Sequence, residues 1–498
     1  MTSATPQAPT TTGVIIVGAG FAGVGMAVGL LGAGRKDFVI LEKASQLGGT
    51  WRDNTYPGCA CDVQSHLYSF SFEPNPNWTR MFAPQGEIQS YLLHVAEKYG
   101  VRPFIHFNRA MAHARFDEGR NLWCVRTTSG ETYEAPVLVA AVGGLSTPAF
   151  PTDVPGLSQF QGTMFHSQAW DHGYDLTGKR VAVLGTGASA IQFVPVIQPK
   201  VAHLTLFQRT PPWVLPKPDR PVRAWERALF RWLPWTQKLF RAAIYCRLEA
   251  RVVAFVLQPR LMELARALGR AHLEAQVPDP ALRARLTPDY ALGCKRVLMS
   301  DTYYPAITQP NVELVTNAVT EVRAHSVLTR DGREHLVDAI ILGTGFKAND
   351  PIPPGLVYGR GGVDLTTAWK DGPEAYKGTC VAGFPNLFFL VGPNVGLGHS
   401  SMIYMIESQV TYVLDALALM ARDRLATLEV RAEQQRGFND TLQGRLRRAV
   451  WNQGGCRSWY LLPNGKNVTL WPGFTFEFRR KLKHFDPAAY QATKVTAP

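Results

Sequence analysis

The stretch VIIVGAGFAG, residues 14–23, decides the fold of this chain. Its four β-branched residues are typical of a buried parallel strand, and the glycines that follow turn directly into a helix of small residues. Gly18 permits the tight turn, Gly20 lets the backbone approach a pyrophosphate, and Gly23 lets the helix pack on the strand. The positive end of the helix attracts the phosphates. The stretch therefore predicts a dinucleotide-binding unit.

The next strand strengthens this prediction because it ends at an acidic residue. Residues 38–41, FVIL, lead to Glu42, which lies 19 residues after Gly23. A carboxylate at this position can accept hydrogen bonds from a ribose diol.

The same device occurs a second time, in RVAVLGTGASA, residues 180–190. Here Ala190 replaces the third glycine, which is an accepted variant. The following strand, residues 204–207, leads to Arg209, which lies 19 residues after Ala190. The position that carries an acid in the first unit therefore carries a base in the second.

This difference assigns the cofactors. An acid repels the 2'-phosphate that distinguishes NADP from NAD and FAD, whereas a guanidinium binds it through two hydrogen bonds. We therefore expect FAD at the unit with Glu42 and NADPH at the unit with Arg209. The fold class predicted is α/β, with two Rossmann-like dinucleotide-binding domains.

Size and composition limit the other possibilities. With 498 residues, of which 46% are hydrophobic, the chain exceeds the size at which one core keeps growing. No stretch approaches roughly 18 consecutive apolar residues, and residues 1–6 lack the features of a secretory signal, so we expect a cytoplasmic protein. The seven cysteines are scattered and odd in number, which predicts a reducing compartment, no structural disulfide and no metal site.

Positive charge is concentrated in one segment. The net charge is +13, and residues 209–290 hold 15 Lys and Arg against 7 Asp and Glu. A phosphate-rich cofactor is the simplest partner for this charge. We expect no nucleic-acid partner, because the chain has no motif that reads nucleic acid, and contact with a membrane surface stays open.

Three further stretches resemble one family. Residues 48–62, GGTWRDNTYPGCACD, resemble the [AG]GxWxxxx[FY]P[GM]xxxD signature of type I Baeyer-Villiger monooxygenases. Residues 160–171, FQGTMFHSQAWD, resemble their FxGxxxHxxxW[PD] fingerprint, in which Trp170 stands where nitrogen- and sulfur-oxygenating relatives usually have Tyr. Residues 338–346, DAIILGTGF, resemble the strand and turn that return to the FAD domain. The resemblance spans residues 14–490.

The resemblance implies an NADPH- and O2-dependent oxygenase of small-molecule ketones, with sulfoxidation left open as a further activity. In the family NADPH reduces FAD, O2 adds to give a C4a-peroxyflavin, and the ketone becomes an ester or lactone. An N- or S-oxygenating flavin monooxygenase is the main alternative. An NADPH oxidase or reductase, suggested only by Cys59 and Cys61, and a nucleotide sensor are others. The ketone and the oligomeric state are not fixed by any motif.

The resemblance also assigns roles to single residues. It implies that Arg296 is the catalytic cation, that Lys295 is a second ligand of the 2'-phosphate, and that Asp62 orients Arg296. The alternatives are a solvated Lys-Arg pair and a turn-capping aspartate. His166 and Trp170 are expected to couple domain motion to cofactor binding, with a general-base role for His166 as the alternative.

The C-terminal part supplies the last expected elements. Residues 384–394 predict a strand and turn, and GHSSM, residues 398–402, opens a helix running toward Val413. This part resembles the element that closes the FAD domain in the family, and the resemblance implies that the helix N-terminus faces the flavin pyrimidine, where it would stabilise negative charge. It also implies that Met402 lies beside the nicotinamide, with plain core packing as the alternative. The resemblance implies that Trp459 is the mobile-loop residue that contacts NADP, although residues 461–466 depart from the family.

These arguments define a domain plan and a predicted site. The FAD domain is expected at 1–150 and 346–498, the NADP domain at 151–214 and 291–345, and a helical insertion at 215–290. The apolar residues of this insertion, which is helical to about Gln276, suit ordinary helix packing, a substrate tunnel or a membrane-facing surface. The predicted cofactor-binding residues are Gly18, Gly20, Phe21, Ala22, Gly23, Glu42, Lys43, Gly49, Thr50, Trp51, Asp62, Val63, Tyr68, Met111, Gly185, Thr186, Gly187, Ala188, Ser189, Gln192, Arg209, Thr210, Lys295, Arg296, Met402 and Trp459.

Overall fold

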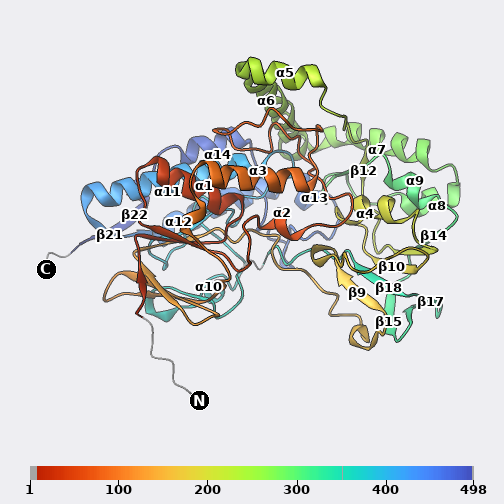
Figure 1. The fold of residues 1–498 in the computed structure, drawn as a ribbon, viewed down its shortest axis with the longest axis horizontal. Helices are drawn as coiled ribbons and strands as arrows, with labels where there is room; N and C mark the ends of the chain where they lie inside the picture. The colour runs from red at the N-terminus through yellow and green to blue at the C-terminus, as the bar shows by residue number, and fades with distance from the viewer. Residues whose placement is uncertain (1–7, 350–351, 496–498) are drawn as a thin grey trace.

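The structure is a computed structural model that describes residues 8–349 and 352–495. Residues 1–7, which include the segment considered as a secretory signal, lie outside the described residues. Figure 1 shows the helical and sheet layers of the chain, with the first dinucleotide unit on the left and the second on the right.

The first unit is built on a five-stranded parallel sheet with the strand order β20-β8-β2-β3-β4. Four of the strands come from the N-terminal part of the chain, while β20 comes from the C-terminal part. All residues of β2 are buried, as the run of apolar residues predicts. The strands are β2 (Val14–Val17), β3 (Phe38–Leu41), β4 (Ile105–His106), β8 (Val137–Ala140) and β20 (Leu387–Phe389).

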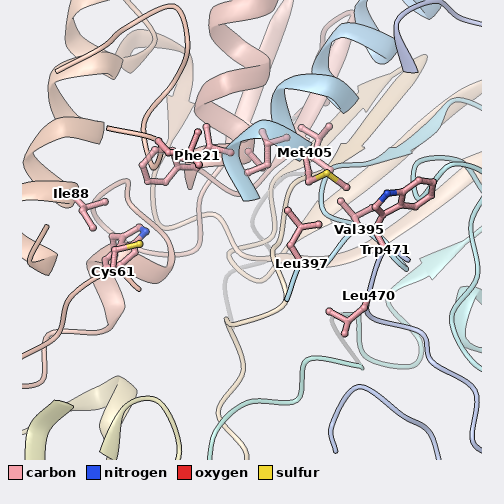
Figure 2. Packing of buried hydrophobic residues seen from close by; sticks show 14 of the residues in the cluster. Phe21, Cys61, Ile88, Val395, Leu397, Met405, Leu470 and Trp471 are labelled. Carbon is pink, nitrogen blue, oxygen red and sulfur yellow. The ribbon is translucent and has the colours of Figure 1, made fainter. Parts of the chain in front are cut away.

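Two helices from opposite ends of the sequence pack together in the first unit. Helix α1 (Phe21–Gly32) lies against α11 (Met402–Asp423). By length and composition α11 could cross a membrane, but 56% of its apolar window is buried inside the fold, as in a core helix. Figure 2 shows Phe21 of α1 and Met405 of α11 in the main hydrophobic cluster, together with Cys61 and Trp471 from distant loops.

The second unit repeats this plan. Its five strands are also all parallel, in the order β14-β11-β10-β18-β9. They all lie between residues 163 and 342, so the second unit interrupts the first along the chain. The strands are β9 (Thr163–His166), β10 (Arg180–Leu184), β11 (His203–Phe207), β14 (Val312–Val315) and β18 (Ala339–Leu342).

Smaller sheets and further helices complete the two units. The other strands are β1 (Thr10–Thr11), β5 (Met111–Asp117), β6 (Leu122–Thr127), β7 (Thr132–Ala135), β12 (Val214–Leu215), β13 (Leu298–Met299), β15 (Val319–Arg323), β16 (Ser326–Thr329), β17 (Glu334–Leu336), β19 (Val357–Tyr358), β21 (Leu425–Val430) and β22 (Tyr490–Lys494). The other helices outside the insertion are α2 (Thr50–Asp53), α3 (Gln85–Lys98), η1 (Arg102–Phe104), η2 (Leu157–Gln159), η3 (Ser167–Ala169), α4 (Ala190–Ile197), α9 (Tyr303–Ile307), η6 (Arg360–Gly362), α10 (Leu365–Ala368), α12 (Ala432–Leu446), α13 (Val450–Gln453), α14 (Thr475–Leu482) and η7 (Pro487–Ala489).

The two crossings between the units run side by side. Residues 147–149 and 344–347 exchange backbone hydrogen bonds, including Ala149 N to Gly345 O at 2.8 Å. The ring of His166 lies beside Phe150 and Phe346 at this crossing. His166 is buried, its Nδ1 accepts from the Gln168 amide, and burial lowers its pKa. His166 thus lies in the crossing between the two units, and its role in coupling domain motion to cofactor binding stays a prediction.

The predicted insertion is helical. It contains α5 (Ala224–Trp232), α6 (Pro234–Glu249), the π-helix η4 (Val253–Leu257), η5 (Pro259–Leu261), α7 (Met262–Gln276) and α8 (Pro280–Leu286). In Figure 1 the α5–α6 hairpin lies at the upper edge of the molecule. It is attached to the first unit through His66, which is packed against the rings of Phe230 and Phe240. The His66 carbonyl also accepts a hydrogen bond from Arg241 at 2.8 Å.

This attachment predicts a pH-dependent stability. Burial lowers the pKa of His66 to about 4; nearby Glu226 opposes the shift, and Arg241 and Arg220 add to it. Between pH 6.5 and 4, His66 is therefore protonated in the unfolded chain but neutral in the folded chain. The free energy of unfolding falls as the pH falls through this range. From pH 7 to pH 5 we expect a loss of about 2 kcal/mol from this residue.

Urea unfolding at the two pH values checks this expectation. His66→Asn keeps an acceptor for the neighbouring amide but does not titrate, so its stability should change less with pH than that of the wild type. His484→Asn, on the surface, is the matched control and should behave like the wild type. Equal pH slopes for His66→Asn and the wild type would contradict the assignment.

Candidate active site

The first glycine turn has the geometry that a pyrophosphate needs. Gly18 has φ +104°, and a Cβ there would lie 2.7 Å from the Ala141 carbonyl oxygen. A Cβ on Gly23 would lie 1.9 Å from the Gly18 carbonyl oxygen, so the close approach of helix and strand requires glycine. Gly20 instead faces Gly49, whose backbone is its nearest neighbour. Two glycine segments thus leave a cradle lined by backbone beside the N-terminus of α1.

Glu42 lies at this turn, as its position after β3 predicts. One carboxylate oxygen accepts from the Ala19 amide at 2.8 Å, and the other accepts from the Ala44 amide and from Arg52. Arg52 also binds Asp53. Sequence reasoning missed Arg52, because a single arginine within the signature gives no sign that it pairs with a residue ten positions earlier.

The second glycine turn matches the first. Gly185 has φ +109°, and a Cβ there would lie 2.5 Å from the Gly343 carbonyl oxygen. A Cβ on Gly187 would meet nothing within 4 Å, so this position is open for a ligand. Thr186, Ala188 and Ser189 complete the loop before α4, and the Thr186 hydroxyl donates to the Thr210 carbonyl.

Two cations from distant segments meet beyond the end of β11. Burial and the charge of Arg209 lower the pKa of Lys295, and the nearby Asp289 carboxylate opposes this shift. The Lys295 ammonium lies 4.9 Å from the centre of the Tyr290 ring. Within the described ranges neither Arg209 nor Lys295 forms an ion pair with an acidic side chain. Two adjacent cations without an acidic partner suit an anionic ligand.

Asp62 and Arg296, which lie 234 positions apart in sequence, form an ion pair. Both Nε and Nη2 of Arg296 donate to Oδ2 of Asp62, at 2.9 and 2.5 Å. About a third of each side chain remains exposed. Burial disfavours the Asp62 carboxylate, but the attraction of Arg296 outweighs it and lowers the Asp62 pKa; the same attraction raises the Arg296 pKa. Both groups are therefore charged at neutral pH.

Two further residues act on this ion pair, and sequence reasoning did not assign them a role. Tyr460 lies beside it, and burial raises the pKa of its hydroxyl to about 12, although Arg296 works in the opposite direction. The Tyr460 hydroxyl is buried without a hydrogen-bond partner among the described residues. Lys217 adds a second positive charge that helps to lower the Asp62 pKa. Both residues come from segments distant in sequence, so no spacing rule could place them here.

Lys217 also lines a hollow of about 420 Å³ beside the signature loop. Cys59 of this loop faces it, and Lys217 lies over the Phe82 ring. The other lining residues are Tyr56, Gly58, Ala60, Arg80, Pro84, Gln85, Gly86 and Asp219.

The prediction of no structural disulfide was wrong. Cys294 and Cys456 are joined, with a sequence separation of 162 and Cα atoms 6.1 Å apart. Composition could not reveal the pair, because only the fold brings the two cysteines within bonding distance. The bond connects the segment of Lys295 and Arg296 to the loop that carries Trp459 and Tyr460.

Breaking this bond should destabilise the protein. A cross-link between such distant residues restricts the unfolded chain, so we expect Cys456→Ser to lower the free energy of unfolding by about 2–4 kcal/mol. Denaturant unfolding with and without dithiothreitol measures the effect, and reductant should bring the wild type to the level of the variant. The control is Cys246→Ser, at an exposed free cysteine. If Cys456→Ser unfolds like the wild type, the bond does not stabilise the fold.

Cys59 and Cys61 are free and buried. Burial raises the pKa of the Cys59 thiol to about 11 and also raises that of Cys61. Both are therefore protonated at neutral pH, which makes them poor nucleophiles. This leaves the alternative of a disulfide-type NADPH reductase without support from these two residues.

Gln192 joins the second unit to the signature loop. Its amide oxygen accepts from the Tyr56 hydroxyl at 3.0 Å and from the Ala60 amide, and its nitrogen donates to the Ala60 carbonyl. Trp170 continues this contact, because its ring packs against Phe193 of α4, which in turn meets Tyr56. The fingerprint around Trp170 thus touches the helix that begins at the second glycine turn.

The remaining predicted residues lie on several different elements. Gly49, Thr50 and Trp51 lie at the start of α2, and the Trp51 indole donates to the Tyr68 hydroxyl at 3.0 Å. Trp459 is 45% exposed and its carbonyl accepts from Asn349. Phe21 and Ala22 begin α1, Lys43 is exposed after Glu42, Val63 follows Asp62, Met111 begins β5, and Met402 begins α11.

The N-terminus of α11 also suits a flavin. Ser401 caps this helix by accepting from the Ile403 amide. Just before it, the Ser400 hydroxyl and both ring nitrogens of His399 are buried without a hydrogen-bond partner among the described residues, and His399 Nε2 lies 3.4 Å from a Glu249 carboxylate oxygen. Buried polar atoms usually have a partner. These atoms and the glycine cradle together fit FAD. In the part of the chain that the structure describes, no group of three His, Cys, Asp or Glu could hold a metal ion.

Comparisons with known proteins agree with this geometry. Residues 11–353 match the family model described as flavin-binding monooxygenase-like. A Baeyer-Villiger monooxygenase of Pseudomonas aeruginosa is 56% identical, over 99% of this chain and 93% of the relative. The closed crystal structure of a cyclohexanone monooxygenase has a TM-score of 0.88 at 28% identity, and a cyclohexanone monooxygenase from Rhodococcus sp. Phi1 bound to NADP+ has 0.87 at 29%. Each of the two structural matches spans 98% of this chain and 100% of the matched chain.

Proposed function

Since the chain belongs to the flavin-binding monooxygenase-like family and is an FAD- and NADPH-dependent Baeyer-Villiger monooxygenase, we propose that Arg296 and Asp62 carry its oxygen insertion into ketones. The observation that supports this proposal most strongly is the two-point contact of the Arg296 guanidinium with one oxygen of Asp62. FAD, when bound and reduced, supplies the activated oxygen.

Arg296 provides a permanent positive charge at the reacting centre. A ketone carbonyl oxygen gains negative charge when a nucleophile adds to its carbon, and a fixed cation stabilises that charge. A guanidinium does so at every working pH, because it does not lose its proton. Two of its nitrogens bind Asp62 and a third remains available, since about a third of the side chain is exposed.

Asp62 holds the guanidinium in place and balances its charge. Its lowered pKa keeps it ionised even at pH values below the ordinary range of an aspartate, and it accepts both hydrogen bonds through one oxygen. Tyr460 lies near the pair and is protonated at neutral pH. We propose that its hydroxyl donates a hydrogen bond into the site.

The two glycine turns position the cofactors around this pair. Glu42 and the cradle formed by Gly20 and Gly49 would hold FAD, while Gly187, Arg209 and Lys295 would hold NADPH through its phosphates. The remaining predicted cofactor contacts and the domain boundaries at 150, 214, 290 and 345 belong to the same proposal. We place the enzyme in the cytoplasm, where NADPH is available to it, with a small-molecule ketone and O2 as its substrates.

Product analysis with a ketone panel tests the proposal. The holoenzyme is incubated with NADPH, O2 and cyclic or linear ketones, beginning with cyclohexanone, the ligand of one matched cyclohexanone monooxygenase structure. We expect an ester or lactone in proportion to the NADPH consumed. Consumption that yields only hydrogen peroxide with every ketone would overturn the proposal, as would oxidation of amines or thioethers alone.

A further inference from the structure

The tip of the α5–α6 hairpin exposes a group of large apolar side chains. Trp232 is 82% exposed, and Trp225 and Trp235 are 59% and 58% exposed. Leu233 and Leu239 belong to the same group, with Leu239 61% exposed. Indole rings at such exposure cost solvation free energy, and exposed patches of this kind mark interaction sites. We call these five residues the hairpin patch.

Helix geometry pairs the patch residues on each of the two helices. Trp225 and Trp232 are separated by seven residues, or two turns, on α5, so they share one face. Trp235 and Leu239 are separated by four residues on α6 and also share a face. Leu233 lies at the junction of the two helices. Figure 1 shows α5 at the outer edge of the molecule, beyond the helices that cover the two sheets.

The exposed charges around the patch are all positive. Arg223, Arg231, Lys238 and Arg247 are exposed on the hairpin. The two acidic residues of the hairpin are buried, and their carboxylates accept hydrogen bonds from other residues. Glu226 binds Arg220 and the Arg223 amide, and Glu249 accepts from Thr475.

The inner face of the hairpin is attached firmly. Gln237 donates to the Asn75 carbonyl at 2.7 Å, and the Tyr245 hydroxyl bonds Thr475 at 3.0 Å. The Tyr245 ring stacks on Tyr404 of α11, with ring centres 5.0 Å apart. These contacts fix α6 to the body, and the packing of Phe230 against His66 fixes α5, so a small rotation of the hairpin cannot bury the apolar patch.

We infer that the hairpin patch docks this enzyme onto an anionic membrane surface. Tryptophan prefers the boundary between water and the acyl chains, because one end of the indole is apolar and the other is a hydrogen-bond donor. Helices with basic residues beside aromatic and leucine side chains lie in this boundary without spanning the bilayer. Four exposed cations and no exposed acid on the hairpin add attraction for anionic headgroups.

A second copy of the chain is the competing occupant. The charge distribution argues against it, because a twofold contact through this patch would bring the exposed cations of both copies together without an acidic partner on either hairpin. A lipid surface supplies the missing negative charge.

Vesicle sedimentation of the FAD-loaded full chain tests the inference. Vesicles of phosphatidylcholine alone are compared with vesicles in which about a third of the lipid is phosphatidylglycerol. We expect the wild type to pellet with the anionic vesicles, and the affinity to fall at least tenfold for the combined variant Trp225→Ser, Trp232→Ser and Trp235→Ser. The matched control replaces three exposed apolar residues elsewhere, Leu336, Phe476 and Val495, by Ser and should bind as the wild type.

A charge variant separates electrostatic from apolar docking. Lys238→Glu with Arg247→Glu should weaken binding to anionic vesicles about tenfold or more, while Arg436→Glu on α12 should have little effect. All variants should keep the wild-type FAD content. The inference is overturned if the wild type stays in solution with anionic vesicles, or if it binds both vesicle types equally. It is also overturned if the tryptophan variant merely dissociates a dimer while vesicle binding is absent.

Discussion

Replacing Arg296 by Ala should lower the rate of ketone oxygenation by about 10²–10³-fold while leaving FAD bound. Removing one group that stabilises developing negative charge has an effect of this size in other enzymes. Here it also leaves the Asp62 carboxylate without its main partner, so the local charge becomes negative where the reaction needs positive charge. NADPH should still be consumed, because its glycine turn and 2'-phosphate cations remain, and hydrogen peroxide should replace the ester.

The measurement is the ratio of ester formed to NADPH consumed, together with the flavin absorbance of each variant. Arg296→Lys keeps a charge but loses the forked contact with Asp62, so we expect an intermediate ratio. The control is Arg422→Ala, which removes an arginine from a surface pair with Asp423 and should behave as the wild type. If Arg296→Ala formed as much ester per NADPH consumed as the wild type, Arg296 would have no role in the oxygenation.

Removing the cations that we assign to the 2'-phosphate should abolish the preference for NADPH over NADH. Each of Arg209→Ala and Lys295→Ala loses a charged hydrogen bond, which contributes about 1.5–3 kcal/mol, so the KM for NADPH should rise roughly 10–100-fold. The KM for NADH should change little, because NADH has no 2'-phosphate. At saturating NADPH the kcat should stay near that of the wild type.

Steady-state kinetics with NADPH and with NADH tests this assignment. The double variant Arg209→Ala with Lys295→Ala should show the smallest preference for NADPH over NADH. The matched control is Arg330→Ala, which removes an exposed arginine directly after β16. An unchanged NADPH preference in the double variant would mean that other groups recognise the 2'-phosphate.

The sequence predicted the parts of the structure that depend on local pattern. The two glycine turns, the parallel strands around them and the helical insertion follow from short-range rules for strand, turn and helix. Arg296 and Asp62 could be brought together only through the family resemblance, since 234 residues separate them. The helix that begins at Met402 continues ten residues past Val413, because no Gly or Pro interrupts it before Arg424.

What the sequence could not predict depends on contacts between distant segments. The disulfide of Cys294 with Cys456 joins two loops that are adjacent only in the folded chain. The positions of Lys217 and Tyr460 beside Asp62 have the same cause. Sequence patterns also do not predict the exposed fraction of a side chain. The position of Trp232 is compatible with a packed helix face as well as with an exposed one, and only the fold shows that nothing in the described chain covers it.

Oxygen-isotope labelling tests the central claim most directly. The holoenzyme is given NADPH, a ketone that it consumes and ¹⁸O2, and the product is analysed by mass spectrometry. We predict one labelled oxygen in each ester or lactone and one NADPH consumed for each product molecule. An unlabelled ester, or label found only in hydrogen peroxide, would contradict the account.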